Sequence, residues 1–249
     1  MNKETIIISL GGSLVAPALA SGGAGEIDVE FLKKFKVCLE KHFENKQFFI
    51  LVGGGKICRI YQKAISEFGA NDIDKDWIGI GVTKLNAEVI KQVFTGHVYS
   101  EIVADPNKKV NTGKEIIVGS GWSLFKKPEP KDVIVGAGWK PGWSTDYDAV
   151  LIAKNYGAKK IINLTNIDYV YDKDPKDFPD AKPLGEISWK DFKEIIGEKW
   201  SPGANKPFDP VASKLADELG LKVVIINGYK LENLENVLNN RPFIGTIIQ

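Results

Sequence analysis

Two junctions decide the fold of this chain: Ile8-Ser9-Leu10-Gly11-Gly12-Ser13 and Val52-Gly53-Gly54-Gly55-Lys56. In each, a run of apolar residues of strand length ends in glycine. Glycine at a strand end lets backbone N–H groups approach an anion with no Cβ in the way, and a helix that starts there adds partial positive charge. A tight turn would explain any one of these clusters alone. A third cluster, Gly136-Ala137-Gly138, follows another apolar run and favours phosphate binding.

Working outward, strand-length apolar runs alternate with stretches of helical period. Val29–Phe43 and Lys56–Phe68 each place apolar residues on one side of a helix. This alternation predicts an α/β fold, a three-layer αβα sandwich with a mainly parallel central sheet. The expected strands are Thr5–Leu10, Gln47–Val52, Glu115–Val118, Asp132–Val135, Lys160–Leu164, Lys222–Ile226 and Thr246–Ile248.

Composition narrows the classes of function. The 249 residues include 33 basic and 32 acidic side chains, and a net charge of +1 provides no global field for nucleic acid or an anionic membrane. Two cysteines without metal-type spacing fit a reducing compartment, and no apolar segment reaches about 18 residues. We therefore expect a cytoplasmic protein with no nucleic-acid or membrane partner. The only histidines, His42 and His97, give weak support for a zinc site or a Ser-His-Asp triad, so no protein metal site is expected.

Cations near the second glycine junction are candidates for phosphate contact. Lys56 and Arg59 lie three residues apart on one predicted helix, so both side chains can point toward a ligand at its start. The junction lacks the spacing of a Walker loop, and the third glycine of a dinucleotide motif would fall on Cys58. P-loop and Rossmann interpretations are therefore disfavoured.

Two later loops carry polar and aromatic residues. Ser144-Thr145-Asp146 has the residues of a helix N-cap before a helix from Tyr147 to Tyr156, and capping alone would explain them. The neighbouring Trp139, Lys140 and Trp143 fit a closing surface that gives specificity equally well. The second loop, Asn166 to Pro175, mixes aromatic rings with carboxylates, as a site for a base, a ribose or a metal would, but its composition fits a plain turn too.

In series, these segments resemble the uridylate kinases of the amino-acid-kinase superfamily, especially the archaeal-type branch. The resemblance covers nearly the whole chain, and its motifs are weak singly but strong together. It implies the amino-acid-kinase (carbamate-kinase-like) fold as one domain over residues 1–249, with an acceptor half of about 1–138 and an ATP half of about 139–249. The matching segments are Ser9 to Ser13, Val52 to Lys56, Asp76 to Ala87, Pro141 to Asp146, Thr165 to Pro175, Phe208 to Lys214 and Ile244 to Ile248.

The resemblance also implies a reaction, transfer of the γ-phosphoryl group of ATP, carried with Mg²⁺, to UMP. It implies a homo-oligomer, a hexamer in most of the family. It assigns catalysis to Arg59, Lys56 and Asp146. ATP would be bound by Gly11, Gly12, Ser13, Gly55, Arg59, Thr165, Asp168, Tyr171 and Asp174. UMP would be bound by Gly54, Asp76 (through the ribose hydroxyls), Trp139, Lys140, Pro141, Gly142, Trp143, Ser144 and Thr145.

Two positions depart from the family pattern. Ser9 stands where many relatives carry a lysine that bridges the phosphoryl group, although the archaeal-type branch can lack it. Lys56, Arg59 and Lys140, in that order, are the candidates to replace this charge. Tyr169 takes the glycine slot of an Asp-Gly-Val-Tyr motif, which leaves the shape of the adenine-side loop open.

Other functions on this scaffold remain as alternatives. One is a kinase for a carboxylate, a carbamate or an isoprenoid phosphate, although Asp76 favours a nucleotide and no histidine lies near the glycine loops. The other is a non-catalytic protein that binds nucleotides or stores a metal oxyanion such as molybdate.

Overall fold

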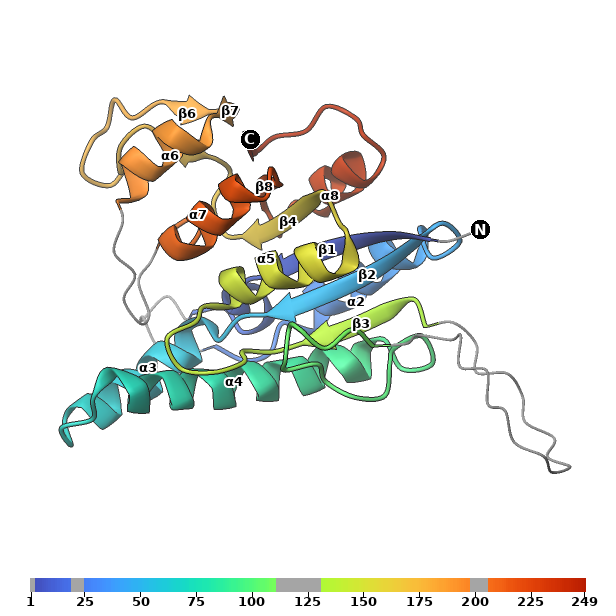
Figure 1. Ribbon diagram of the computed structural model, residues 1–249, viewed down its shortest axis with the longest axis horizontal. Helices are drawn as coiled ribbons and strands as arrows, with labels where there is room; N and C mark the ends of the chain where they lie inside the picture. Colours follow the sequence, from blue (N-terminus) through green and yellow to red (C-terminus); the bar gives the residue numbers. More distant parts are fainter. Residues whose placement is uncertain (1–2, 19–24, 111–130, 198–205) are drawn as a thin grey trace, which may run out of the picture.

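The computed structural model describes residues 3–18, 25–110, 131–197 and 206–249 (Figure 1). Within them the main sheet has seven strands in the order β3-β2-β1-β4-β8-β9-β7, and every pairing is parallel except that of β8 with β9. A separate two-stranded ribbon pairs β5 with β6. The strands are β1 (Glu4–Leu10), β2 (Lys46–Val52), β3 (Val133–Gly136), β4 (Lys160–Thr165), β5 (Val170–Tyr171), β6 (Pro183–Leu184), β7 (Glu186–Ile187), β8 (Lys222–Asn227) and β9 (Thr246–Ile248).

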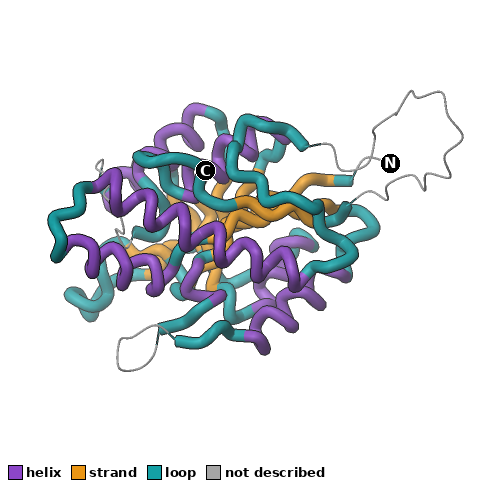
Figure 2. The backbone as a smooth tube through the Cα atoms, turned by 90° about the horizontal axis from the view of Figure 1, so that it is seen from below, coloured by secondary structure: helices purple, strands orange, loops and turns teal. Residues whose placement is uncertain are grey.

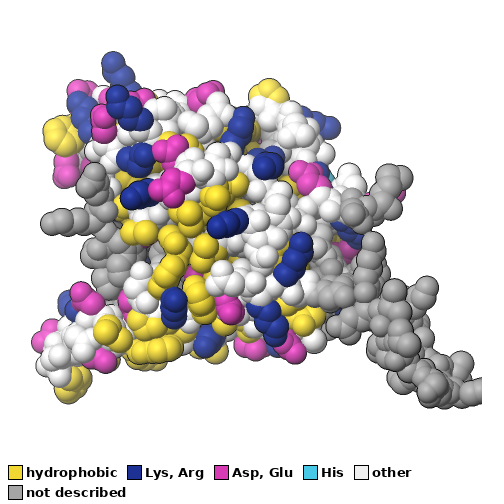
Figure 3. All heavy atoms as spheres, in the orientation of Figure 1, with side chains coloured by type: hydrophobic (Ala, Val, Ile, Leu, Met, Phe, Trp, Pro, Cys, Tyr) yellow, Lys and Arg dark blue, Asp and Glu magenta, His cyan; other side chains and the backbone are white. Residues whose placement is uncertain are grey.

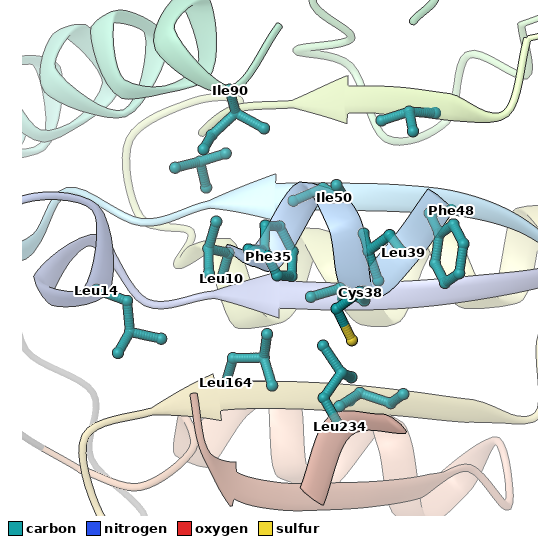
Figure 4. Close-up of a cluster of buried hydrophobic side chains, with 14 of the residues drawn as sticks. Leu10, Leu14, Phe35, Cys38, Leu39, Phe48, Ile50, Ile90, Leu164 and Leu234 are labelled. Atoms are coloured by element: carbon teal, nitrogen blue, oxygen red, sulfur yellow. The ribbon is translucent and has the colours of Figure 1, made fainter. Parts of the chain in front are cut away.

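Successive side chains of a strand point to opposite faces of the sheet, and β1 shows why both faces are covered. Ile6, Ile8 and Leu10 enter one hydrophobic core, and Ile7 enters the other. The first core gathers around Phe35, Leu39, Phe48 and Ile90, as Figure 4 shows. Burial on both faces explains the nearly continuous apolar sequence of the central strands.

The helices form the two outer layers, with strands running between them in Figure 2. Buried side chains of α1, α2, α4 and α8 belong to the first core, and those of α5, α6 and α7 belong to the second. The helices are α1 (Gly12–Val15), α2 (Val29–Glu40), α3 (Gly55–Ser66), α4 (Asp72–Val93), α5 (Thr145–Tyr156), α6 (Trp189–Ile196), α7 (Pro210–Glu218) and α8 (Leu231–Leu238).

Helices α3 and α4 extend beyond the sheet at its carboxyl edge, at the lower left of Figure 1. Helix α3 has no buried residue and packs mainly along α4. Helix α4 starts in a capping box, in which the side chains of Asn71 and Asp74 each accept a bond from the other residue's N–H. This rigid pair of helices forms one wall of the site described below.

The expected fold class is confirmed: the sheet is mainly parallel and lies between two helical layers. Six expected strands are present with small shifts of their ends, and Glu115–Val118 lies outside the described residues. The helix expected at Val29–Phe43 ends at Glu40, and the one expected at Lys56–Phe68 begins at Gly55 and ends at Ser66. Of the three candidate N-caps Ser144, Thr145 and Asp146, Ser144 takes the position, and α5 begins at Thr145, two residues before the expected start. Among the described residues no helix is both long and apolar enough to cross a membrane.

Candidate active site

The two glycine junctions pack directly against each other. A Cβ on Gly12 would overlap the carbonyl oxygen of Gly53 and the amide nitrogen of Gly55. Gly55 has φ +66°, in the left-handed region that favours glycine, so a side chain there would be strained as well as crowded. The loops after β1 and β2 therefore meet through backbone atoms alone.

Next to this contact lies a cavity of about 240 Å³, between α3 and α4 on one side and the starts of α5 and α7 on the other. It is outside the carboxyl ends of the parallel strands, where ligands of open α/β sheets bind. Its lining residues are Gly54, Gly55, Cys58, Arg59, Gln62, Asp76, Gly79, Ile80, Thr83, Trp143, Ser144, Thr145, Asp146, Lys206, Asp209 and Pro210.

Asp146 and Asp209 form an acidic pair in this cavity. Asp146 accepts hydrogen bonds from the Ser9 hydroxyl at 3.0 Å and from the Asp209 N–H at 3.2 Å. Desolvation, with the adjacent Asp209 carboxyl, raises the pKa of Asp146 to about 7. Burial also raises the pKa of Asp209, whose Oδ1 caps α7 by accepting from the Ala212 N–H. Among the described residues its Oδ2 has no hydrogen-bond partner. Near neutral pH the pair can therefore hold a proton or a cation.

Two polar side chains inside the apolar strands hold Asp146 and the segment before α7 in place. Ser9 on β1 and Asn163 on β4 are register neighbours, and both are buried. Ser9 donates to Asp146, while the Asn163 side chain donates to the Pro207 carbonyl at 2.8 Å. Buried polar groups in a sheet need such partners, so both side chains fix the segment that precedes α7.

The loop between β3 and α5 is tied down through its backbone. The Gly138 N–H donates to the Thr83 hydroxyl at 3.0 Å and the Trp139 N–H to the Asp148 carboxyl at 3.2 Å. The Gly142 N–H donates to the Asp76 carboxylate at 2.7 Å. Burial raises the pKa of Asp76, although the Gly142 N–H opposes this. Asp76 thus joins α4 to the loop at the edge of the cavity.

The side chains of that loop form a stacked cluster. Lys140 Nζ lies 4.0 Å from the ring centroid of Trp139 and 4.8 Å from that of Trp143, which is cation–π geometry. Trp143 also meets the edge of Tyr147, with ring centroids 4.1 Å apart. Trp143 lines the cavity, but Trp139 and Lys140 do not. The cluster therefore stiffens the wall that Trp143 presents.

A second group of predicted residues surrounds the segment from Asn227 to Lys230. The Ser13 carbonyl accepts from the Tyr229 hydroxyl, and the Thr165 carbonyl accepts from the Gly228 N–H. Asp168 accepts from Asn227 and pairs with Lys230 at 2.8 Å, and the Lys230 bond lowers the pKa of Asp168. These contacts collect the predicted ATP residues around the ends of β1, β4 and β8.

Two predicted ATP residues lie elsewhere. Tyr171 is on β5, and Asp174 lines a wide hollow of about 1040 Å³ beside β7 and α6. That hollow also contains Asp172, Glu186, Asp191 and Glu194. Within the described residues no three His, Cys, Asp or Glu side chains are grouped to hold a metal ion.

Comparison with known proteins identifies the family to which the sequence and the fold belong. The sequence model of the amino acid kinase family matches residues 4–227. The chain belongs to the amino acid kinase family. It is 32% identical to the uridylate kinase of Pyrococcus abyssi, over 95% of this chain and 96% of that one. Identity to the uridylate kinase of Methanobrevibacter smithii is 30%, over 97% of each chain.

Solved structures agree with this membership. The crystal structure of uridylate kinase from Archaeoglobus fulgidus superposes with a TM-score of 0.76 at 28% identity, covering 98% of this chain and 99% of that one. A UMP kinase from Ureaplasma parvum superposes with a TM-score of 0.74 at 21% identity over the full length of both chains, which supports the fold. The predicted family is therefore confirmed.

Within this amino-acid-kinase framework the cavity gathers eight of the twenty predicted residues. Those that line it are Gly54, Gly55, Arg59, Asp76, Trp143, Ser144, Thr145 and Asp146. Those that do not are Gly11, Gly12, Ser13, Lys56, Trp139, Lys140, Pro141, Gly142, Thr165, Asp168, Tyr171 and Asp174.

Several residues that line the cavity were not predicted from the sequence to be site residues. Lys206 and Asp209 are the charged ones, and Gln62 and Thr83 are polar residues on α3 and α4. Asp-Pro at 209–210 is a typical helix start, and a capping role alone would account for these residue types. Gln62 lies one turn beyond Arg59, and that spacing was an available signal.

Proposed function

We propose that this protein is a uridylate kinase, which transfers the γ-phosphoryl group of ATP to UMP and gives UDP and ADP. The observation that carries the proposal is the cavity, whose lining brings Arg59 and Lys206 together with Asp76 and Ser144, the N-cap of α5. Full-length similarity to proteins named uridylate kinase supports the same reaction.

The chemistry of the acceptor suits a site without a histidine. A phosphate monoester has a second pKa near 6, so at neutral pH UMP is largely a dianion and already nucleophilic. No strong general base is needed. The site must instead bring two anions together, which repel by roughly 4 kcal/mol per charge pair about 4 Å apart at an effective dielectric near 20.

Cations and backbone dipoles offset this repulsion. Arg59 on the exposed outer turn of α3 presents a guanidinium that can hold two phosphate oxygens at once. Lys206 adds charge from the opposite wall, and the amides of Gly54 and Gly55 lie at the start of α3. In this proposal Arg59 stabilises the phosphoryl group in transfer, Lys56 adds charge at the helix start, and Asp146 helps to hold the cation that ATP carries.

The acidic pair fits the Mg²⁺ that ATP carries. Asp209 has a buried carboxylate oxygen that no described residue bonds, beside an Asp146 carboxyl with a raised pKa. Carboxylate oxygens of this kind suit a hydrated Mg²⁺, which keeps most of its waters. Asp146 and Asp209 would hold the ion, and when bound it would supply charge neutralisation between the phosphates.

The remaining assignments follow the two groups of residues. The acceptor nucleotide is bound by Gly54, Asp76 and the loop from Trp139 to Thr145, with Asp76 releasing the Gly142 N–H to take the ribose hydroxyls. ATP is bound at the ends of β1 and β4, from Gly11 to Ser13 and by Thr165 and Asp168, with Tyr171 and Asp174 on the adenine side. This division gives an acceptor half of about 1–138 and an ATP half of about 139–249 in a single domain.

We propose further that the protein works in the cytoplasm as a homo-oligomer, a hexamer by family resemblance. Large apolar side chains are exposed on the protruding helices α3 and α4, where hydrophobic atoms gather at the lower left of Figure 3. They are Ile60, Tyr61, Phe68, Ile73 and Trp77, with Phe68 90% exposed. Exposed apolar surface of this kind favours contact with another subunit.

One assay tests the reaction. The protein is incubated with ATP, Mg²⁺ and, in turn, UMP, CMP, dUMP, carbamate, acetylglutamate and isopentenyl phosphate, and ADP is measured. ADP formed with UMP and not with the non-nucleotides is the expected result. ADP formed only with a carboxylate, carbamate or isoprenoid phosphate would replace the proposal, and ADP with none of them would favour a binding or storage protein.

A further inference from the structure

Asp148 is a buried carboxyl that the proposed reaction does not use. It lies in the first turn and a half of α5, and its exposed fraction is 0%. One oxygen, Oδ2, accepts the Trp139 N–H at 3.2 Å, while Oδ1 has no hydrogen-bond partner in the described part of the chain. Its neighbours Ala149, Val150 and Ile152 all belong to the second hydrophobic core.

An apolar residue would serve the fold better at this position. A buried carboxyl with an unpaired oxygen loses its hydration without full compensation, so it destabilises the folded chain. The charged groups that act on it are Lys140, which stabilises the ionised form, and Asp105 and Asp146, which oppose it. Burial dominates and raises the pKa of Asp148 to about 7. A residue that lowers stability in this way points to a role outside packing.

The single bond of Asp148 shows what that role is. The loop from Ala137 to Trp143 has no regular secondary structure, and the described bonds that hold its amides to side chains come from Thr83, Asp148 and Asp76. Asp148 supplies the middle one of these three bonds, at Trp139, where the loop leaves the buried end of β3. Beyond it the loop carries Trp143 and Ser144 into the cavity wall.

We propose that Asp148 is a positioning residue, which fixes the path of the loop from Trp139 to Ser144 so that it meets the acceptor nucleotide, and which the chain retains although it weakens the fold. The inference rests on the proposed uridylate kinase reaction, because the acceptor is taken to be UMP. Asp148 does not touch substrate in this account. It acts through the Trp139 N–H and the wall that follows.

Three variants of Asp148 separate the effects of the side chain's shape, of its hydrogen bond to the Trp139 N–H and of its negative charge. Asp148→Asn keeps an oxygen for the Trp139 N–H, and its KM for UMP should stay within about twofold of the wild type. Asp148→Leu fills the space without an acceptor, and we expect a KM for UMP raised about tenfold with kcat little changed and a Tm equal or higher. Asp148→Ala is the second test of the same loss if the leucine does not fit.

Asp132→Asn is the matched control. Asp132 is also a buried carboxyl, but Lys3 and His97 satisfy it at the other end of β3, outside the site. Its substitution should lower the Tm and leave the KM for UMP unchanged. This is the reverse of the pattern expected for Asp148→Leu.

Hydrogen exchange gives a readout that needs no substrate. In the free protein, the amides of Trp139, Lys140 and Gly142 should exchange about tenfold faster in Asp148→Leu than in the wild type, and at the wild-type rate in Asp148→Asn. Unchanged exchange in both Asp148→Leu and Asp148→Ala, or an unchanged KM for UMP in both, would overturn the proposal. If the wild type forms no ADP from UMP, the proposed reaction fails, while exchange still decides whether Asp148 holds the loop.

Discussion

The acidic pair Asp146–Asp209 lies in the cavity, and the ion pair Asp168–Lys230 lies just beyond the ends of β4 and β8. The two pairs place an aspartate in opposite surroundings. Asp146 is desolvated beside another carboxyl, and its pKa is raised to about 7. Asp168 is partly exposed, accepts hydrogen bonds from Lys230 and Asn227, and has a lowered pKa. The first arrangement weakens the fold, and the second weakly supports it. The difference indicates that the cavity contains buried carboxyl groups that lower the stability of the fold and serve its chemistry.

The largest expected effect tests the cavity side of this comparison. Arg59→Ala should lower turnover with UMP by about 10²–10³-fold, the loss typical of one preorganised contact to a transition state. Its Tm should change little, because the Arg59 side chain is exposed. Steady-state kinetics and thermal unfolding measure the two.

Lys63→Ala is the control for Arg59. Lys63 lies one turn further along α3, is exposed and does not line the cavity. It should keep wild-type turnover. Equal losses in both variants would mean that the general positive charge of α3, rather than the position of Arg59, matters.

The second prediction concerns pH and stability. A carboxyl whose folded pKa is raised binds its proton more tightly when folded, so the free energy of unfolding falls as pH rises from about 4 to about 7. Asp146→Asn removes the part of this dependence that Asp146 contributes and should stabilise the protein by about 1–3 kcal/mol at pH 8, with little gain at pH 4. Urea unfolding at both pH values measures it. A gain of equal size at pH 4 and pH 8 would show that ionisation of Asp146 is not the cause.

A smaller effect is expected at the edge of the cavity. Asp76→Asn keeps an oxygen for the Gly142 N–H but loses the charge that favours ribose hydroxyls, so KM for UMP should rise about tenfold, or about 1.4 kcal/mol. The KM for ATP should not change. Titration of both nucleotides checks this, and a rise confined to ATP would move Asp76 out of the acceptor site.

The smallest effect belongs to the exposed ion pair. Asp168→Asn should lower stability by at most about 1 kcal/mol at neutral pH, as exposed pairs do, and high salt should reduce the difference further. Because the Asp168 pKa is lowered, this contribution is lost as pH falls through the acid range, opposite in sign to that of Asp146. Unfolding at two salt concentrations and two pH values measures it. A loss of several kcal/mol in the free energy of unfolding would show that the Asp168–Lys230 pair stabilises the fold strongly, which would contradict the difference described between the two regions.

Much of the fold could be predicted from local pattern. The apolar runs located the strands because burial on both faces leaves little room for polar residues, and Ser144 was a recognisable N-cap. The glycine junctions were correctly placed at strand ends. Their mutual contact was not foreseen, because it depends on how closely β1 and β2 bring their following loops together.

The cavity was only partly predictable. Arg59 and Asp146 stood out by type and spacing, whereas Lys206 and Asp209 join them through contacts over 60 residues or more of sequence. Ser9 and Asn163 carried a usable signal, since a polar residue in the middle of a buried strand requires a partner. Asp148 gave no such signal, because an acidic residue near a helix start is ordinary.

The loop after β3 is tied to the surrounding elements through its amides, while its side chains stack mainly on one another. A main-chain N–H is present in every residue except proline, so the tethers at 139 and 142 do not depend on which side chain stands at 139, 140 or 141. Substitutions at these three positions can alter the surface offered to a new acceptor while the path of the loop stays the same. For a designer who wants a kinase of different substrate preference, these are the positions to randomise first, and Gly12 and Gly55 are the ones to leave alone.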